Sequence, residues 1–234
     1  MQSRIGIFGG TFAPFHVGHR WIIKDMIDTY QLSDLYIIPT IVSYHRAGKD
    51  EYPMLESTKR EIILRMCHKL PYFYSSRIHL DESEWEYRNY CRGLSDEAWN
   101  DLVGGRRFIH TLLDFCVRHK IDLTSARPYV CLGTDSFKNL DKWYHGLEIQ
   151  KLCTLVVVQG RNDDVVKRTD VQGYHQSFMP YELRGVSATR IREAMLNRNW
   201  NHYLEDVERY DRGEVELEKL GWCEPSTPLT TSAS

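Results

Sequence analysis

The chain has 234 residues, of which 42% are hydrophobic and 26% are charged. A chain of this length and composition can bury a full core, so we expect one compact domain and neither a disordered nor a fibrous protein. Thirty lysine and arginine residues against thirty-two acidic residues leave a net charge of −2, so no global field recruits nucleic acid.

The cysteines and the hydropathy narrow the class further. Six cysteines are spread along the chain without a C-x-x-C pair, and several lie inside apolar runs. We expect reduced core thiols of a cytoplasmic protein, and neither a disulfide framework nor a zinc site. No apolar run approaches the ~20 residues that span a bilayer, so we expect a soluble chain without membrane contact or targeting segment. A homo-oligomer is compatible with the sequence, which does not indicate the oligomeric state.

Strand-like and helical patterns alternate along the chain. The predicted strands are the short apolar runs at residues 4–8, 35–38, 78–80, 129–132 and 155–158. The predicted helices, with apolar residues at helical spacing, lie at residues 18–30, 56–68, 106–118 and 136–142. This alternation predicts an α/β fold with a doubly wound parallel sheet, and a ligand crevice at the carboxyl ends of the strands.

Two segments fall outside this alternation. Residues 81–105 are rich in Glu, Asp, Tyr, Trp and Arg and have no clean period, and we interpret them as an insertion or lid over the crevice. Residues 224–234 are rich in Pro, Ser and Thr, which is typical of a disordered tail. The predicted organisation is therefore a single domain over residues 1–223 with an insertion, followed by that tail.

The first predicted strand runs directly into the segment G-G-T-F-A-P-F-H-V-G-H, residues 9–19. Its two glycines would let the backbone turn sharply and come close to a ligand. The free amides of a helix that begins near Gly18 favour an anion at this turn. His16 and His19 then face the same anion, and the positive helix end favours neutral imidazoles that donate N–H to phosphate oxygens. Metal binding or helix capping by the two histidines is the alternative.

A second anion-binding pattern is G-V-S-A-T-R-I-R-E-A-M, residues 185–195. Ser187 can cap a helix whose buried face includes Ile191. Arg190 and Arg192 then lie in the first turns, where the positive end of the helix dipole disfavours each cation by roughly 0.3 to 1 kcal/mol. A bound polyphosphate would reverse that sign. The alternative is that both arginines reach only solvent or a carboxylate.

A third pattern, Y-V-C-L-G-T-D-S-F over residues 129–137, is a strand, a glycine turn and an acid at the start of a helix. Asp135 can accept hydrogen bonds from ribose hydroxyls, and the ring of Trp143 can stack on a flat heterocycle. The alternative is an aspartate that caps its helix and a tryptophan that packs in the core.

Together these segments resemble the signature of one family. The first is similar to the G-G-T-F-x-P-x-H-x-G-H pattern of the nucleotidyltransferase α/β-phosphodiesterase superfamily, most closely to nicotinate or nicotinamide mononucleotide adenylyltransferases. The second is similar to the S-S-T-x-I-R motif of that family, and the third to its G-x-D-S segment with a downstream Trp. The resemblance extends over about residues 4–197 and implies a Rossmann-like nucleotidyltransferase fold.

The resemblance also implies which residues bind the substrates. It assigns the catalytic groups to His16, His19 and Arg192. It places the ATP phosphates against Gly10, Thr11, Phe12, Arg46, Ser187 and Thr189. It places the ribose or the mononucleotide against Gly133, Asp135, Trp143 and Arg161. No residue is assigned to a metal, because Mg²⁺, the expected cofactor, is carried largely by the phosphates.

The implied reaction transfers the adenylyl group of ATP to nicotinate or nicotinamide mononucleotide, which gives deamido-NAD or NAD and pyrophosphate. A phosphate oxygen of the mononucleotide attacks the α-phosphorus in line, so catalysis is mainly positioning and charge stabilisation. One alternative is a sibling phosphopantetheine adenylyltransferase or cytidylyltransferase. Another is a non-catalytic nucleotide-binding module, for which the departures from the family pattern at Ala13, Phe108 and Ala188 are the hints.

Overall fold

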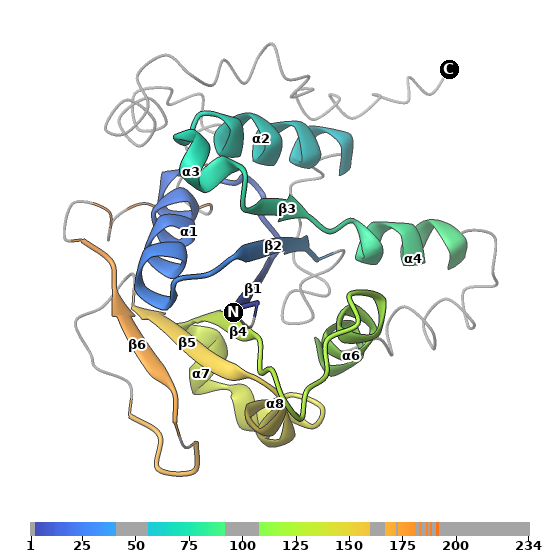
Figure 1. Cartoon of the computed structure of the whole chain (residues 1–234), viewed down its shortest axis with the longest axis vertical. Helices are drawn as coiled ribbons and strands as arrows, with labels where there is room; N and C mark the ends of the chain where they lie inside the picture. Colours follow the sequence, from blue (N-terminus) through green and yellow to red (C-terminus); the bar gives the residue numbers. More distant parts are fainter. Residues whose placement is uncertain are drawn as a thin grey trace, which may run out of the picture.

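A parallel sheet of six strands, in the order β3-β2-β1-β4-β5-β6, forms the centre of the computed structural model (Figure 1). The structure describes residues 3–40, 56–91, 108–159, 167–171 and 173–180, together with Leu183, Val186, Ala188 and Ile191. The strands are β1 (Ile5–Gly10), β2 (Asp34–Pro39), β3 (Ile78–Leu80), β4 (Tyr129–Gly133), β5 (Thr154–Gln159) and β6 (His175–Phe178).

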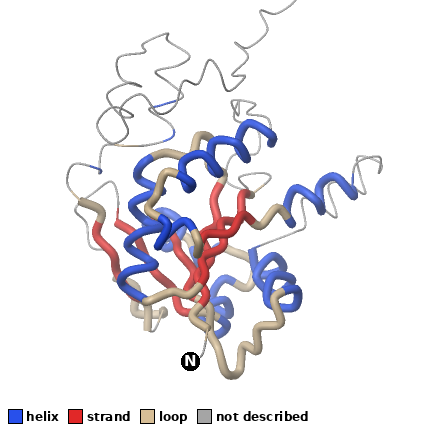
Figure 2. The backbone as a smooth tube through the Cα atoms, turned by 45° about the horizontal axis from the view of Figure 1, so that its top comes forward, coloured by secondary structure: helices blue, strands red, loops and turns tan. Residues whose placement is uncertain are grey.

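Helices connect and cover these strands (Figure 2). The helices are α1 (Val17–Tyr30), α2 (Glu56–His68), α3 (Tyr72–Ser75), α4 (Ser83–Cys91), α6 (Phe108–Arg118), α7 (Thr134–Lys138), the 3-10 helix η1 (Leu140–Lys142) and α8 (Gly146–Leu152). Among the described helices, none combines the length and the apolar character that a bilayer crossing requires.

Side chains alternate across the sheet and build one apolar layer on each face, because successive residues of a strand point in opposite directions. Phe8 of β1 belongs to the buried cluster that includes residues of α1 and α2. Its neighbour Ile7 belongs to a second cluster, which includes residues of α6, η1 and α8. Every central strand is therefore covered on both faces, which explains the continuous apolar runs in the sequence.

The direction in which the sheet grows reverses between β1 and β4. The chain adds β2 and β3 on one side of β1, and then crosses to β4 and adds β5 and β6 on the other side. In open parallel sheets, ligands bind at the carboxyl ends of the two strands that flank such a reversal. The segments after Gly10 and after Gly133 therefore line the expected crevice.

The predicted α/β fold with a doubly wound parallel sheet is confirmed, and each of the five predicted strands lies within two residues of an observed one. The prediction missed β6, whose sequence His175–Phe178 is not an apolar run and has one buried residue, Ser177. It also missed the short helices α3 and α8.

The backbone does not turn at Gly9 and Gly10, where the sequence predicts the turn after β1. The strand continues through Gly9 and Gly10, which pair with Ile38 and Pro39 of β2. The left-handed residue of the turn is Phe12, with φ 46°. The turn therefore begins two residues later than predicted.

The segment expected to be an insertion or lid begins as part of the packed structure. Helix α4 occupies its first part and extends from the end of β3 (Figure 1). The side chains of Asp81, Glu84 and Trp85 are buried. The absence of a clean period at residues 81–91 has a physical reason, because polar side chains that are buried against another helix hide the helical period. The interpretation of residues 81–105 as an insertion or lid stays a prediction. Residues 92–105 and the predicted tail at 224–234 lie outside the described residues, so the extent of the domain stays a prediction.

The described cysteines are core residues, as the sequence predicts. Cys67, Cys116, Cys131 and Cys153 are all buried and not disulfide-bonded. The side chains of the other two cysteines lie outside the part that the structure describes.

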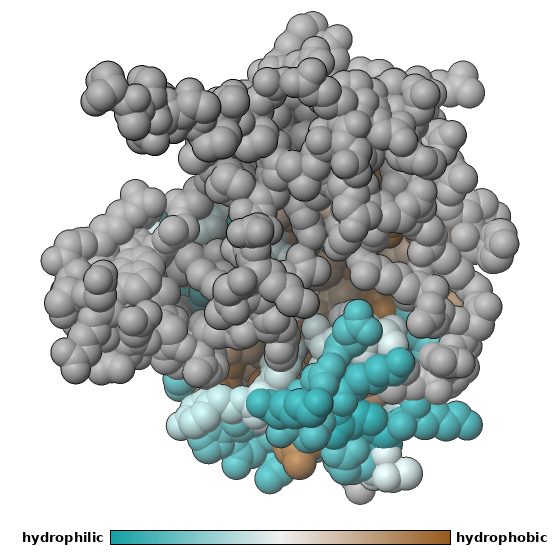
Figure 3. Space-filling view, turned by 180° about the vertical axis from the view of Figure 1, so that it is seen from behind, coloured by the Kyte–Doolittle hydropathy of each residue, from teal (hydrophilic) through white to brown (hydrophobic). Residues whose placement is uncertain are grey.

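Much of the described surface seen from behind is hydrophilic (Figure 3).

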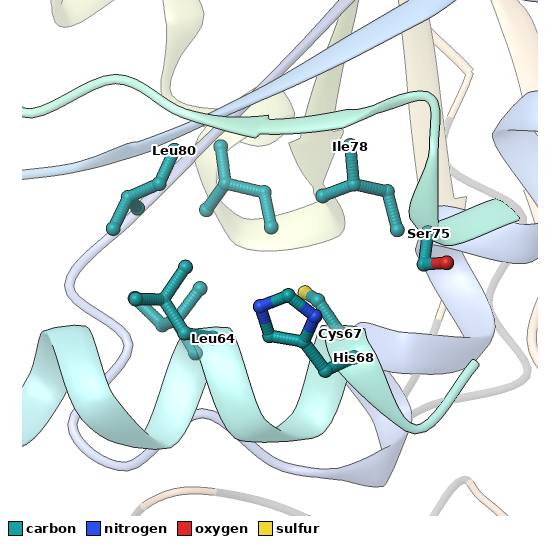
Figure 4. A pocket seen from close by; sticks show the side chains of 8 residues that line it. Leu64, Cys67, His68, Ser75, Ile78 and Leu80 are labelled. Carbon is teal, nitrogen blue, oxygen red and sulfur yellow. The ribbon is translucent and has the colours of Figure 1, made fainter. Parts of the chain in front are cut away.

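A small pocket lies between α2 and the β2–β3 edge of the sheet (Figure 4). Its lining residues are Ile37, Ile63, Leu64, Cys67, His68, Ser75, Ile78 and Leu80. None of these is a predicted site residue, and the lining is mostly aliphatic. This pocket is therefore separate from the crevice at the strand reversal.

Candidate active site

The loop between β1 and α1 is fixed by the ring of Phe12. This ring is buried, and a Cβ placed on Gly10 would lie only 2.9 Å from it. Glycine at position 10 is thus required for the close approach of the ring to the backbone. The carbonyl of Gly10 accepts a hydrogen bond from the amide of Thr40 at 2.9 Å, which ties the end of β1 to the end of β2.

The two histidines meet at the start of α1, as the sequence predicts. His16 is the N-cap residue, and its ring stacks on that of His19 with the centroids 3.8 Å apart. The backbone N–H of His16 donates to Nδ1 of His19 at 3.1 Å. A Cβ on Gly18 would lie 3.1 Å from Cε1 of His16, so the glycine between the histidines leaves room for the stacked ring.

The contacts of His19 define both its tautomer and its orientation. Because Nδ1 accepts a backbone hydrogen bond, the proton of the neutral imidazole is assigned to Nε2. The ring centroid also lies 5.8, 5.1 and 5.0 Å from those of Phe8, Phe12 and Phe15. The aromatic box formed by these three phenylalanines holds an imidazole whose Nε2 is a hydrogen-bond donor.

The capping alternative for the histidines is therefore realised in part. The two residues form a reciprocal capping arrangement at the first turn of α1. This arrangement is compatible with anion binding, because it uses Nδ1 of His19 and not Nε2. Among the described residues, no group of three His, Cys, Asp or Glu side chains is placed to hold a metal ion.

The second wall of the crevice follows β4. Gly133 is exposed, and a Cβ at this position would meet nothing within 4 Å. Asp135 lies in the first turn of α7, and its side chain is exposed. An exposed carboxylate just past a strand end is positioned to accept hydrogen bonds from a ligand that enters the crevice.

Trp143 is the residue that follows η1, and its side chain packs against the apolar cluster that includes Ile7 of β1. Its ring makes an edge contact with Phe108, the first residue of α6, at 5.6 Å and 61°. The Phe108 ring in turn lies 3.8 Å from the position of a Cβ on Gly9. The end of β1, the start of α6 and Trp143 are thus brought together from three distant parts of the sequence. The indole N–H of Trp143 is buried and has no acceptor among the described residues.

One described residue of the second anion-binding pattern packs beside the first pattern. Ile191 is helical and buried, and it belongs to the same cluster as Phe12 and Phe15. Met179, just after β6, lies 3.6 Å from the position of a Cβ on Gly18. Ile191, Met179 and the phenylalanines of the first pattern therefore belong to one apolar cluster, which includes residues of α1.

Eight of the predicted site residues lie in the segments at and after the carboxyl ends of β1 and β4. The loop after β1 and the start of α1 carry Gly10, Thr11, Phe12, His16 and His19. The segment after β4 carries Gly133, Asp135 and Trp143. The other five predicted residues, which are Arg46, Arg161, Ser187, Thr189 and Arg192, lie outside the described residues.

Sequence reasoning missed a buried polar connection between α4 and α6. Glu84 is 5% exposed and accepts a short hydrogen bond from the hydroxyl of Thr111. Asp81 is 6% exposed and accepts hydrogen bonds from the backbone N–H of Ser83 and from Nη1 of Arg118, both at 3.0 Å. The available signal was Asp81 itself, an acid directly after a predicted strand.

The environment of Asp81 favours its charged form. Burial alone would raise the pKa of Asp81, but the hydrogen bonds from Ser83 and Arg118 outweigh burial, so the pKa is lowered. The charged pair joins the end of β3 to the C-terminal turn of α6. This connection orients α6, whose first residue is the Phe108 that contacts Trp143.

The family comparison agrees with this geometry. A family model described as cytidylyltransferase-like matches residues 7–194, which include both histidines, the first anion-binding pattern and residues 185–194 of the second. The chain belongs to this cytidylyltransferase-like family. The region that the family model matches begins within β1 and ends three residues after Ile191, the last residue that the structure describes.

Relatives of this cytidylyltransferase-like chain include two bacterial proteins named probable nicotinate-nucleotide adenylyltransferase. The protein of Dictyoglomus turgidum is 26% identical over 216 residues, which are 88% of this chain and 92% of the relative. The protein of Pseudothermotoga lettingae is 29% identical over 202 residues, which are 84% of this chain and 88% of the relative.

A solved structure of similar fold is the Plasmodium falciparum nicotinic acid mononucleotide adenylyltransferase complexed with NaAD. Its TM-score is 0.62 at 13% identity, with 89% of this chain and 96% of that chain covered. The same Plasmodium enzyme complexed with APC has a TM-score of 0.59 at 14% identity, with 82% of this chain and 83% of that chain covered. At these identities the likeness establishes a shared fold.

Proposed function

We propose that the chain transfers the adenylyl group of ATP to a pyridine mononucleotide and releases pyrophosphate. The observation that carries this proposal is the stacked His16–His19 pair at the start of α1, which follows one of the two strands at the reversal, whereas Asp135 follows the other. The names of the bacterial relatives favour nicotinate mononucleotide over nicotinamide mononucleotide as the acceptor.

The triphosphate of ATP would lie at the N-terminal end of α1. The first amides of a helix are free to bind an anion, and the helix dipole favours negative charge there. Nε2 of His19 would donate a hydrogen bond to a phosphate oxygen, and Thr11 would add its hydroxyl. The proposed remaining contacts come from Arg46, Ser187, Thr189 and Arg192, which the family resemblance assigns.

The acceptor would lie against the second wall, where Trp143 can stack on its pyridine ring and Asp135 can accept from a ribose hydroxyl. This places the attacking phosphate oxygen near the α-phosphorus, and the pyrophosphate departs in line. The residues around the phosphates need only position the reactants and neutralise charge, so no covalent enzyme intermediate is required. Mg²⁺, held mainly by the phosphate oxygens, would neutralise charge that develops on the leaving pyrophosphate.

The proposal is tested by incubating the purified chain with ATP, Mg²⁺ and either nicotinate or nicotinamide mononucleotide. Formation of the dinucleotide and of pyrophosphate in equal amounts is the expected result, with nicotinate mononucleotide as the better acceptor. The variant His19→Ala is expected to lose activity. The matched control is His68→Ala, because His68 is an exposed histidine at the end of α2.

If neither acceptor gives product while the chain still binds ATP, the proposed reaction is wrong. Adenylylation of phosphopantetheine, or use of CTP in place of ATP, would identify the chain as a phosphopantetheine adenylyltransferase or a cytidylyltransferase. A chain that binds nucleotide but converts none of these acceptors would be a non-catalytic module.

A further inference from the structure

Arg168 joins the chain beyond β5 to the segment that follows β4. Its side chain is only 12% exposed. Nη1 donates to the carbonyl oxygens of Phe137 and Lys138 at 3.0 and 3.1 Å, and to Oδ1 of Asp141 at 2.8 Å. One guanidinium nitrogen thus contacts three acceptors, of which two are backbone carbonyls.

The other side of the guanidinium is fixed as well. Nε and Nη2 donate to the two carboxylate oxygens of Asp170 at 3.0 and 2.5 Å, which is a bidentate pair. The backbone carbonyl of Asp170 accepts a hydrogen bond from the side chain of Gln150 in α8 at 3.3 Å. Arg168 is therefore a rigid link between the chain before β6 and the segment that follows β4.

The acceptors of Arg168 lie between the two residues that face the crevice. Phe137 and Lys138 are the last two residues of α7, and Asp141 lies in η1. Asp135 precedes Phe137 by two residues, and Trp143 follows Asp141 by two residues. The spacing and relative orientation of Asp135 and Trp143 therefore depend on the backbone that Arg168 holds.

Within this segment, the side chain of Asn139 donates to the carbonyl of Asp135 at 2.8 Å, but the helical turns themselves are short. Helix α7 has five residues and η1 has three, and isolated helices of this length are unstable. The start of the segment is fixed by Thr134, whose hydroxyl donates to the carbonyl of Val158 at 3.1 Å. Arg168 fixes its end by donating to the carbonyl of Phe137, which also accepts from the N–H of Asn139, and to the carbonyl of Lys138.

We propose that Arg168 is a positioning residue for the nucleotide-binding wall, by which we mean residues 134–143. It sets the relative placement of Asp135 and Trp143, so that one mononucleotide contacts both. This inference rests on the proposed function for the identity of the substrate. The clamp formed by Arg168, Asp141 and Asp170 does not touch the phosphate loop after β1. Its loss should therefore weaken acceptor binding far more than it slows the chemical step.

The test compares Arg168→Gln and Arg168→Lys with the matched control Arg60→Gln. Arg60 forms one ion pair with Glu82 at 2.8 Å and is 53% exposed, so its loss should leave the segment unchanged. Arg168→Gln is expected to raise KM for the mononucleotide by about tenfold and to change kcat less than about threefold, as expected when binding geometry is disturbed. Arg168→Lys should restore the bond to Asp141 but not the fork to Asp170, and so recover only part of the loss.

A second measurement needs no substrate. Amide hydrogen exchange of residues 134–146 should be faster in Arg168→Gln than in the wild type, and unchanged in Arg60→Gln. If wild-type chain forms no dinucleotide, the proposed function fails, and this exchange measurement alone decides whether Arg168 orders the segment.

Two results would overturn the inference. One is unchanged exchange of residues 134–146 in Arg168→Gln. The other is a fall in kcat with unchanged KM for the mononucleotide, which would indicate a general loss of active protein and not a misplaced wall.

Discussion

At the scale of single residues, the site depends on how His19 is held. The hydrogen bond from the His16 backbone fixes which ring nitrogen is the donor, and the aromatic box of Phe8, Phe12 and Phe15 holds the ring. A preorganised donor costs no reorganisation when charge develops on the phosphates, so we expect the placement of His19 to affect the rate and not only the affinity.

Replacement of His19 by phenylalanine separates packing from chemistry. The new ring can occupy the same aromatic box but cannot accept from the backbone N–H of His16, so we expect the variant to fold with a modest fall in the thermal midpoint. The donor is lost, so kcat/KM should fall about 10²-fold or more, as for other lost transition-state donors. Steady-state kinetics and thermal unfolding of the same preparation measure both effects. A folded His19→Phe variant with wild-type turnover would rule out a catalytic role for this imidazole.

Gly18→Ala probes the space between the histidines. The added Cβ would lie 3.1 and 3.2 Å from Cε1 and Nδ1 of His16, so the stacked ring must shift by a few tenths of an ångström. Alanine is about 1 kcal/mol better than glycine in a helix interior, which offsets the strain at this first-turn position. We expect nearly unchanged stability with about a tenfold loss of kcat/KM, because small misplacements of reacting groups are costly. A loss of stability with unchanged kinetics would show that the His16 ring position does not matter for turnover.

At the scale of elements, the polar connection of α4 to α6 positions one side of the crevice. Glu84 and Asp81 are buried on the side that faces α6, and their partners Thr111 and Arg118 both belong to α6. This connection holds α6, whose first residue contacts Trp143.

The charge of Asp81 makes this connection sensitive to acid. The pKa of Asp81 is lowered in the fold, so its contribution is present above the pKa of the unfolded chain and is lost as the pH falls through the folded pKa. Asp81→Asn should lower the free energy of unfolding by about 2 kcal/mol at pH 7, as for a broken buried charge pair. The difference from wild type should shrink below about pH 4, near the usual aspartate pKa.

Urea unfolding from pH 3 to pH 7 measures this difference. Glu61→Gln is the control, because Glu61 forms an exposed pair with Arg65 at 2.7 Å and should change stability by only a few tenths of a kcal/mol. A difference between wild type and Asp81→Asn that is the same at every pH would mean that the Asp81 charge does not stabilise the fold.

The elements also explain which parts of the structure are readable from sequence. Strands β1, β2, β4 and β5 are apolar on both faces, and such runs are visible without any tertiary information. Strand β6 is not visible, because pairing with β5 and not its own composition makes it a strand. Helix α4 is hidden because the charged residues Asp81, just before it, and Glu84, within it, are buried, whereas a sequence pattern treats charged residues as exposed.

The site is readable to a similar degree. Sequence alone places the two histidines after the first strand and Asp135 after the fourth, with Trp143 downstream; their roles in the site stay predictions. The tautomer of His19 and the clamp at Arg168 are not readable from sequence, because both depend on contacts that only the folded chain creates.

At the scale of the whole molecule, the two apolar layers share the same strands. Cys67 and Cys131 belong to the layer of α1 and α2, whereas Cys116 and Cys153 belong to the layer of α6 and α8. Because β1, β4 and β5 contribute side chains to both layers, separation of one layer should disrupt the other. We therefore expect the described part of the chain to unfold as one cooperative unit.

The buried thiols report on this cooperativity. Burial raises the pKa of Cys67 and of Cys153 to about 12, and that of Cys116 to about 11, so each remains a protonated, unreactive thiol in the fold. In native protein at pH 8, an aromatic disulfide reagent should leave all four core cysteines unmodified while a small model thiol reacts fully. In increasing urea, peptide mapping should show the four cysteines becoming labelled at a common midpoint. Earlier labelling of Cys116 and Cys153 than of Cys67 and Cys131 would contradict a single unit, because it would mean that the α6–α8 layer opens while the α1–α2 layer stays packed.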